Sequence, residues 1–140
     1  MSANSGSCLC GSIKLAIRGD PVMTNLCHCT TCQKFSGSVF ASLSVYKTKD
    51  VTITESEPSI MKMFEDRTPE SGRVLYRWFC GKCGSPVRGT RADSDELTVV
   101  PVGIIDHGKA SLKPTVELFC KSKVNWVGDV DGAELFAALP

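Results

Sequence analysis

Cys27-His28-Cys29-Thr30-Thr31-Cys32 is the densest of three short cysteine-rich segments in this chain of 140 residues. We call these segments knuckles. The first is Cys8-Leu9-Cys10, the one above is the second, and the third is Cys80-Gly81-Lys82-Cys83, so that together they hold seven of the eight cysteines. Cysteines two or three positions apart in a tight turn can bring their sulfurs to roughly 3.8 Å, the spacing around one tetrahedral zinc ion. The knuckles therefore predict metal binding.

Seven cysteine ligands make one complete four-cysteine site and leave a three-cysteine site. A structural zinc is closed by four protein ligands, whereas a catalytic zinc keeps one position open, so we expect two zinc ions per chain, one of each kind. A metal clip between distant segments restricts the unfolded chain most. This favours a structural site of Cys8, Cys10, Cys80 and Cys83 and a catalytic site of Cys27, Cys29 and Cys32. Spacing alone also allows the second knuckle to share a metal with Cys80 and Cys83.

Disulfide bonds are the alternative to metal, because an even number of cysteines is typical of small secreted domains. Residues 1–20 contain no apolar run of the length that a secretory signal needs. Thiols in the cytosol stay reduced, and clustered cysteines there bind metal more often than they pair. We therefore expect reduced cysteines and a cytoplasmic protein.

The charge balance excludes some partners. The chain has 16 basic and 15 acidic residues and no cluster of lysines or arginines, which argues against binding to nucleic acid. No apolar stretch approaches the ~20 residues that span a bilayer, so we expect no membrane segment. The length predicts one domain over residues 1–140.

Strand patterns dominate the chain. Ile13, Leu15 and Ile17 alternate with polar or small residues, the period of a half-buried strand. Strands are predicted over residues 12–18, 38–45, 51–54, 60–64, 73–79, 96–105 and 115–120, and short helices over 30–36 and 132–138. The first knuckle then opens the strand 12–18, the second lies in the loop that follows it, and the third ends the strand 73–79. We expect an all-β fold, mainly β with short helical turns.

Four segments also resemble a known family. They are residues 8–13, beginning Cys8-Leu9-Cys10-Gly11, residues 27–40 around the second knuckle, residues 79–85 around the third, and the Trp-containing segment 124–132. In this order they are similar to the glutathione-dependent formaldehyde-activating enzyme family, which includes a centromere-protein branch.

The resemblance implies a zinc-binding fold of the β-tent type. It implies the same division of ligands: a structural zinc on Cys8, Cys10, Cys80 and Cys83 and a catalytic zinc on Cys27, Cys29 and Cys32. It also implies a reaction, the joining of formaldehyde to glutathione to give S-hydroxymethylglutathione, which in reverse is a carbon–sulfur lyase reaction. The expected partner is therefore glutathione or its aldehyde adduct.

Residues outside the knuckles carry weaker expectations. A fourth ligand for the three-cysteine site would have to come from Cys120, His28 or His107. We expect Cys120 to pack in a strand and His107 to lie in an exposed turn. We expect His28 to form a local hydrogen bond or to assist proton transfer. Arg77 and Arg88 are candidates for a substrate carboxylate, although an exposed sheet face is the preferred interpretation. We expect Trp78 and Trp126 to pack.

Three other functions fit the same cysteines. The first is a non-catalytic binding module stabilised by zinc. The second is an enzyme of the same type for another small carbonyl compound, and the third is a reductase of the methionine-sulfoxide type. An incomplete metal site disfavours the binding module, since a scaffold gains little from an open position. Dense cysteine clustering disfavours the reductase, because a metal-bound thiolate is not free for redox turnover.

Overall fold

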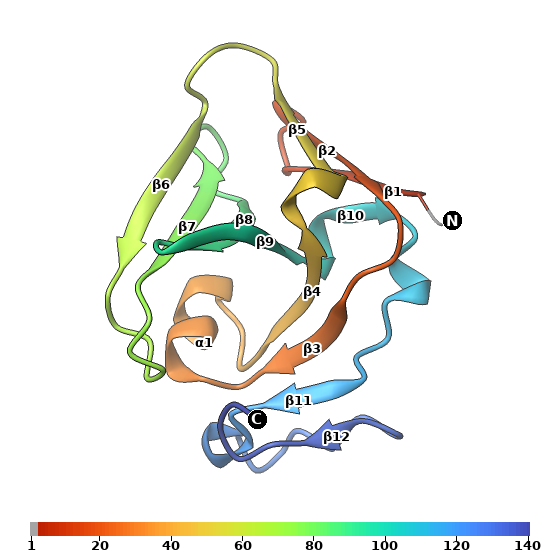
Figure 1. Cartoon of the computed structure of the whole chain (residues 1–140), viewed down its shortest axis with the longest axis vertical. Helices are drawn as coiled ribbons and strands as arrows, with labels where there is room; N and C mark the ends of the chain where they lie inside the picture. The colour runs from red at the N-terminus through yellow and green to blue at the C-terminus, as the bar shows by residue number, and fades with distance from the viewer. Residues whose placement is uncertain (1–2) are drawn as a thin grey trace.

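The computed structural model describes residues 3–140, and their backbone is mainly β, as predicted (Figure 1). Within this range the strands form two sheets. The smaller sheet has the order β10 (Ile105–His107), β1 (Ala3–Ser7), β2 (Ile13–Arg18) and β5 (Val51–Glu55). The larger has the order β12 (Glu134–Leu135), β11 (Val116–Leu118), β3 (Met23–Cys27), β4 (Ala41–Lys47), β9 (Ser94–Pro101), β8 (Pro86–Arg91), β7 (Leu75–Cys80) and β6 (Met61–Asp66).

The helical segments are short. Residues 3–140 contain one α-helix, α1 (Thr30–Ser36), which confirms the helix predicted there. Single 3-10 turns cover Thr48–Asp50, Val102–Ile104, Lys109–Ser111 and Cys120–Ser122. No helix in the described part of the chain is both long and apolar enough to cross a bilayer.

The main core lies between the two sheets. Along β2 the side chains of Ile13, Leu15 and Ile17 are buried while their neighbours are exposed, which is the predicted alternation. They join a cluster that includes Tyr46 of β4 and Val100 of β9. Figure 1 shows β1, β2 and β5 on one side of the molecule and β6, β7 and β8 on the other.

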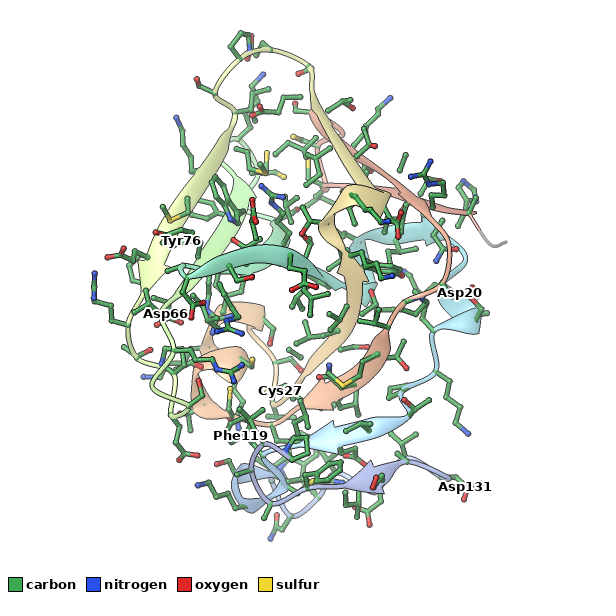
Figure 2. All side chains as sticks on the ribbon, in the orientation of Figure 1. Asp20, Cys27, Asp66, Tyr76, Phe119 and Asp131 are labelled. Carbon is green, nitrogen blue, oxygen red and sulfur yellow. The ribbon has the colours of Figure 1, made fainter. Side chains whose placement is uncertain are left out.

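A second, smaller core surrounds the second knuckle. It consists of Cys27, Cys32, Ala41, Leu118 and Phe119, with Phe136 and other half-buried apolar residues packed around it. Figure 2 shows Cys27 and Phe119 lying close together, where β3 approaches β11. The second knuckle is therefore part of a packed region formed by β3, α1 and the C-terminal segment.

Several element predictions were wrong. Residues 132–138 form no α-helix and instead contain the short strand β12. The second knuckle lies only partly in a loop, because β3 ends at Cys27 and α1 begins at Thr30, with His28 and Cys29 between them. The first knuckle lies in the turn between β1 and β2 rather than at the start of a strand. The predicted strand 96–105 is split at Pro101, after which a 3-10 turn carries the chain into β10 of the other sheet.

Candidate metal centre

The first and third knuckles meet although about 70 residues separate them. The sulfurs of Cys8, Cys10, Cys80 and Cys83 all lie within 4.8 Å of one another. The distances from Cys10 Sγ are 3.6 Å to Cys8 Sγ and 3.8 Å to Cys80 Sγ. These values match the sulfur–sulfur edge of a zinc tetrahedron, roughly 3.8 Å, and exceed a disulfide bond of about 2.05 Å. All eight cysteines are free, so this donor set fits a tetrahedral zinc ion.

The backbone of both turns supports thiolates. The N–H of Ile13 donates to Cys8 Sγ at 3.3 Å, and the N–H of Lys82 donates to Cys80 Sγ at 3.4 Å. Gly84 follows the last cysteine of the third knuckle with a φ of +78°, a conformation that other residues rarely adopt. Burial raises the pKa of Cys8 to about 11, whereas hydrogen bonds from Ser85 lower the pKa of Cys83 to about 5.

The second knuckle forms a separate group. The sulfurs of Cys27, Cys29 and Cys32 lie within 4.8 Å of one another, and within residues 3–140 no fourth cysteine, histidine or carboxylate joins them. Cys27 ends β3, and Cys32 lies in the first turn of α1. Cys29 is the N-cap of α1, and its sulfur accepts the Cys32 N–H at 3.4 Å. The geometry thus separates this knuckle from Cys80 and Cys83, which spacing alone had left as possible partners.

The three thiols influence one another strongly. Hydrogen bonds from Cys27 and Cys32 lower the pKa of Cys29 to about 2. The contacts with Cys29 and Cys32, together with burial, raise the pKa of Cys27 well above its ordinary value. Because these sulfurs lie close together, the ionisation of one thiol disfavours the ionisation of the other two. A divalent metal removes this conflict because all of its sulfur ligands are deprotonated, so the donor set fits a cation with three thiolate ligands.

A buried arginine lies beside this three-cysteine group. Arg77 of β7 donates through Nε to Asp66 Oδ2 at 2.6 Å and through Nη2 to Thr31 Oγ1 at 3.3 Å. The Thr31 hydroxyl lies 3.3 Å from Cys29 Sγ. The preferred interpretation of Arg77 as part of an exposed sheet face was therefore wrong, because its side chain points toward α1 and is 11% exposed.

His28 belongs to a third group of potential ligands, with Glu117 and Cys120. Its Nε2 lies 2.7 Å from Glu117 Oε1, and both side chains are fully buried. The same carboxylate oxygen accepts from Lys123 Nζ at 2.9 Å, and the Val130 N–H donates to the other oxygen at 2.8 Å. An ammonium ion thus already supplies the positive charge here, so we interpret this group as an ion-pair network. The expected local hydrogen bond of His28 was wrong, since its partner is 89 residues away.

The remaining candidates lie away from the cysteine groups or only help to build them. Arg88 is cross-strand from Trp78 and its guanidinium stacks on that ring at 5.0 Å, on the sheet face opposite to Arg77. Trp78 donates to Thr90 Oγ1, as a packed indole should. Trp126 does not pack, because it is 73% exposed. Cys120 begins a 3-10 turn and is only half-buried, so its predicted place in a strand was also wrong.

Three residues at the site were missed from the sequence: Thr31, Asp66 and Glu117. Only Glu117 carried a signal. A charged residue between Val116 and Leu118 in an apolar strand demands a buried partner. Thr31 and Asp66 carried none, because their roles depend on how β6 pairs with β7 and how α1 lies against that pair.

Comparisons with known proteins concern the fold and the family of this chain. A crystal structure of a Rhodobacter sphaeroides protein, a structural-genomics target, matches with a TM-score of 0.56 at 20% sequence identity, covering 74% of this chain and 88% of that one. This likeness concerns the fold alone. The family model described as glutathione-dependent formaldehyde-activating enzyme matches residues 3–122. Since that match spans most of the sequence, the chain belongs to the glutathione-dependent formaldehyde-activating enzyme family.

Proposed function

We propose that this protein is a zinc-dependent enzyme of the carbon–sulfur lyase type that acts on the adduct of glutathione and a small aldehyde, with formaldehyde as the first substrate to test. Family membership supports the reaction class. The observation that carries the proposal is the group of Cys27, Cys29 and Cys32, which has no fourth protein ligand among the described residues. A site that keeps a position open suits chemistry better than it suits stability.

Two zinc ions per chain are part of the proposal. Cys8, Cys10, Cys80 and Cys83 would hold the structural ion, and Cys27, Cys29 and Cys32 would hold the catalytic one. When bound at an open site, zinc lowers the pKa of a substrate thiol and polarises a carbonyl oxygen.

The reaction balances without an external oxidant or reductant. The glutathione thiol gives up its proton, its sulfur forms a bond to the aldehyde carbon, and the aldehyde oxygen receives a proton, giving S-hydroxymethylglutathione. In the reverse direction the carbon–sulfur bond breaks and the sulfur regains its proton. The cysteines of the second knuckle hold the site on the start of α1, and Thr31 hydrogen-bonds one of them. The buried His28 is turned toward Glu117, so we assign it no proton-transfer role.

The wider expectations are consistent with this function and belong to the same proposal. They are a single domain over residues 1–140, a β-tent type of zinc fold, a cytoplasmic location, and a small-molecule partner rather than a nucleic acid. The free cysteines and the near-neutral charge of +1 support them.

Exchange NMR of glutathione with formaldehyde tests the function. We expect the zinc-loaded protein to exchange these compounds with the adduct faster than the uncatalysed background, and the Cys29→Ala variant to lose that acceleration. Cys120→Ala is the matched control, because Cys120 is a half-buried cysteine outside both cysteine groups. It should keep full activity and both metals.

Background exchange in the zinc-loaded native protein would exclude formaldehyde as the substrate. The same assay with other small aldehydes would then test the alternative of a different carbonyl substrate. Full activity and full metal content in Cys29→Ala would instead show that the second knuckle is not the active site.

A further inference from the structure

We propose that Arg77 is a positioning residue of the three-cysteine site, which it serves by orienting the Thr31 hydroxyl toward Cys29 and by favouring an anionic fourth ligand. This inference deepens the proposed function and rests on it. The residues involved come from three elements: Arg77 from β7, Asp66 from β6, and Thr31 from α1. Figure 2 shows Asp66 on the side of the molecule where β6 and β7 approach α1.

The direction of the hydrogen bonds follows from the groups themselves. A guanidinium can only donate, so Thr31 Oγ1 accepts from Arg77 Nη2 at 3.3 Å. That leaves the single proton of the hydroxyl free for another acceptor. Cys29 Sγ lies 3.3 Å from the same oxygen, and a thiolate in a metal site can only accept. The two hydrogen bonds therefore run in one direction: Arg77 donates to Thr31, and Thr31 donates to Cys29.

Arg77 is fixed before any ligand arrives. Asp66 Oδ2 holds its Nε at 2.6 Å, and the other oxygen of Asp66 accepts from both the N–H and the hydroxyl of Thr68. The guanidinium carbon also lies 5.0 Å from the centre of the Phe35 ring. Because the side chain is buried and held on two sides, little conformational entropy is lost when it acts on the site.

The negative charge of the metal-loaded site explains why a nearby guanidinium would favour thiol binding. Three thiolates and one divalent ion carry a formal charge of −1, and a bound substrate thiolate would make the total charge −2. A second anion is disfavoured at such a site unless a positive group lies nearby. Asp66 binds the Nε edge of Arg77, whereas the Nη2 atom faces Thr31 and the second knuckle. Arg77 thus keeps its Nη2 group on the side of Thr31 and Cys29, and we infer that this positive charge favours the additional negative charge of a thiolate ligand.

Thiol binding to the cobalt-loaded protein tests this without turnover. Co²⁺ replaces zinc at both sites, and 2-mercaptoethanol, which has no carboxylate, is titrated while the thiolate-to-cobalt absorption is followed. We expect Arg77→Met and Thr31→Val each to weaken thiol binding about tenfold, the scale of one charge-assisted hydrogen bond. Arg77→Lys should recover part of the loss, because it keeps the charge but not the planar fork.

Arg88→Met is the matched control. Arg88 is also a partly buried arginine of the same sheet, but it lies on the opposite face, stacked on Trp78. This variant should bind the thiol as the native protein does. The absorption of the four-cysteine site serves as an internal check of folding, and if Arg77→Met fails to fold, the smaller change Thr31→Val decides the outcome.

The possible failures are distinguishable. If the native protein binds the thiol but Arg77→Met and Thr31→Val bind it equally well, the inference is wrong and the proposed function stands. If the variants bind glutathione more weakly than the native protein does but bind 2-mercaptoethanol equally well, Arg77 recognises a substrate carboxylate and the positioning role is wrong. If the native cobalt protein does not respond to either thiol, the proposed function fails and the inference with it.

Discussion

Gly6 is a residue of β1 that has no room for a side chain. A Cβ atom added there would collide with the carbonyl group of Ile104, and this group belongs to the backbone, so it cannot rotate away. The conflict comes from close approach rather than from a special backbone angle. We expect Gly6→Ala to lower the free energy of unfolding by about 1–3 kcal/mol, the usual cost of overpacking, measured by urea denaturation of the zinc-loaded protein.

Gly103→Ala is the control for that change. Gly103 lies next to Ile104, but a Cβ atom there would meet nothing within 4 Å. It should therefore leave the stability almost unchanged. Equal stability of the two variants would mean that β1 and β10 can separate to admit the methyl group without loss.

At this scale, sequence reasoning grouped the cysteines as the structure does, but it placed their neighbours poorly. The cysteines are recognisable because short spacing forces their sulfurs together, and the structure does group Cys8 and Cys10 with Cys80 and Cys83. Arg77 and Trp126 were assigned to the wrong environments, since the first is buried and the second exposed. Their environments depend on which elements lie over them, and a single sequence does not contain that information.

Among the elements, β11 fixes the C-terminal segment against the second knuckle. It pairs in parallel with β3, which brings Glu117 beside Leu26 and Leu118 beside Cys27. The buried Glu117 then reaches His28, the residue between two cysteines of the knuckle. Burial by itself would raise the pKa of Glu117, but the Val130 N–H, Lys123 and His28 outweigh it, so the pKa lies below its ordinary value of 4.5.

Glu117→Gln should therefore be costly and its effect should depend on pH. At pH 7 we expect a loss of about 3 kcal/mol in the free energy of unfolding, the scale for breaking a buried ion pair. A depressed carboxyl pKa contributes stability above its unfolded-state value and loses it as the pH falls through its folded-state value. The difference between native and variant proteins should thus be full at pH 7 and shrink below pH 4.5, as measured by urea denaturation.

The exposed Glu134 provides the control for that measurement. Glu134→Gln, on the neighbouring strand β12, should leave the free energy of unfolding almost unchanged both at pH 7 and below pH 4.5. A Glu117→Gln penalty that stays constant down to pH 3 would contradict the assigned role of the carboxylate charge.

Sequence patterns missed β1 and β8 and misassigned residues 132–138, for two different physical reasons. β1 (Ala3–Ser7) contains almost no apolar residue, and β8 (Pro86–Arg91) begins with proline and includes Gly89, so neither shows a strand pattern. Residues 132–138 include three alanines, a glutamate and a leucine, which favour a helix. There the backbone instead pairs with β11 and the turn after it, through bonds such as Phe136 N–H to Glu117 and Cys120 N–H to Phe136. Tertiary hydrogen bonds outweighed local propensity.

In the molecule as a whole, the two cysteine groups tie together different amounts of chain. The four-cysteine group joins the β1–β2 turn of one sheet to the β7–β8 turn of the other, across the main core. The three-cysteine group lies within six consecutive residues and closes no long loop. The same ligand chemistry should therefore have unequal effects on stability at the two places.

Stepwise removal of metal tests this difference. A chelator should first remove the ion held by three cysteines, because that site has one ligand fewer, and Tm should then change little. Removal of the second ion opens a loop of about 70 residues, which in a chain-entropy estimate costs about 4 kcal/mol and lowers Tm by roughly 15 °C. Metal content and Tm measured along one chelator titration would show two separate steps.

Cys83→Ala should reproduce the second step and Cys29→Ala the first, because each variant removes one ligand from one group. Loss of both ions together with unfolding in a single step would contradict this division, since it would mean that the three-cysteine ion also holds the sheets together.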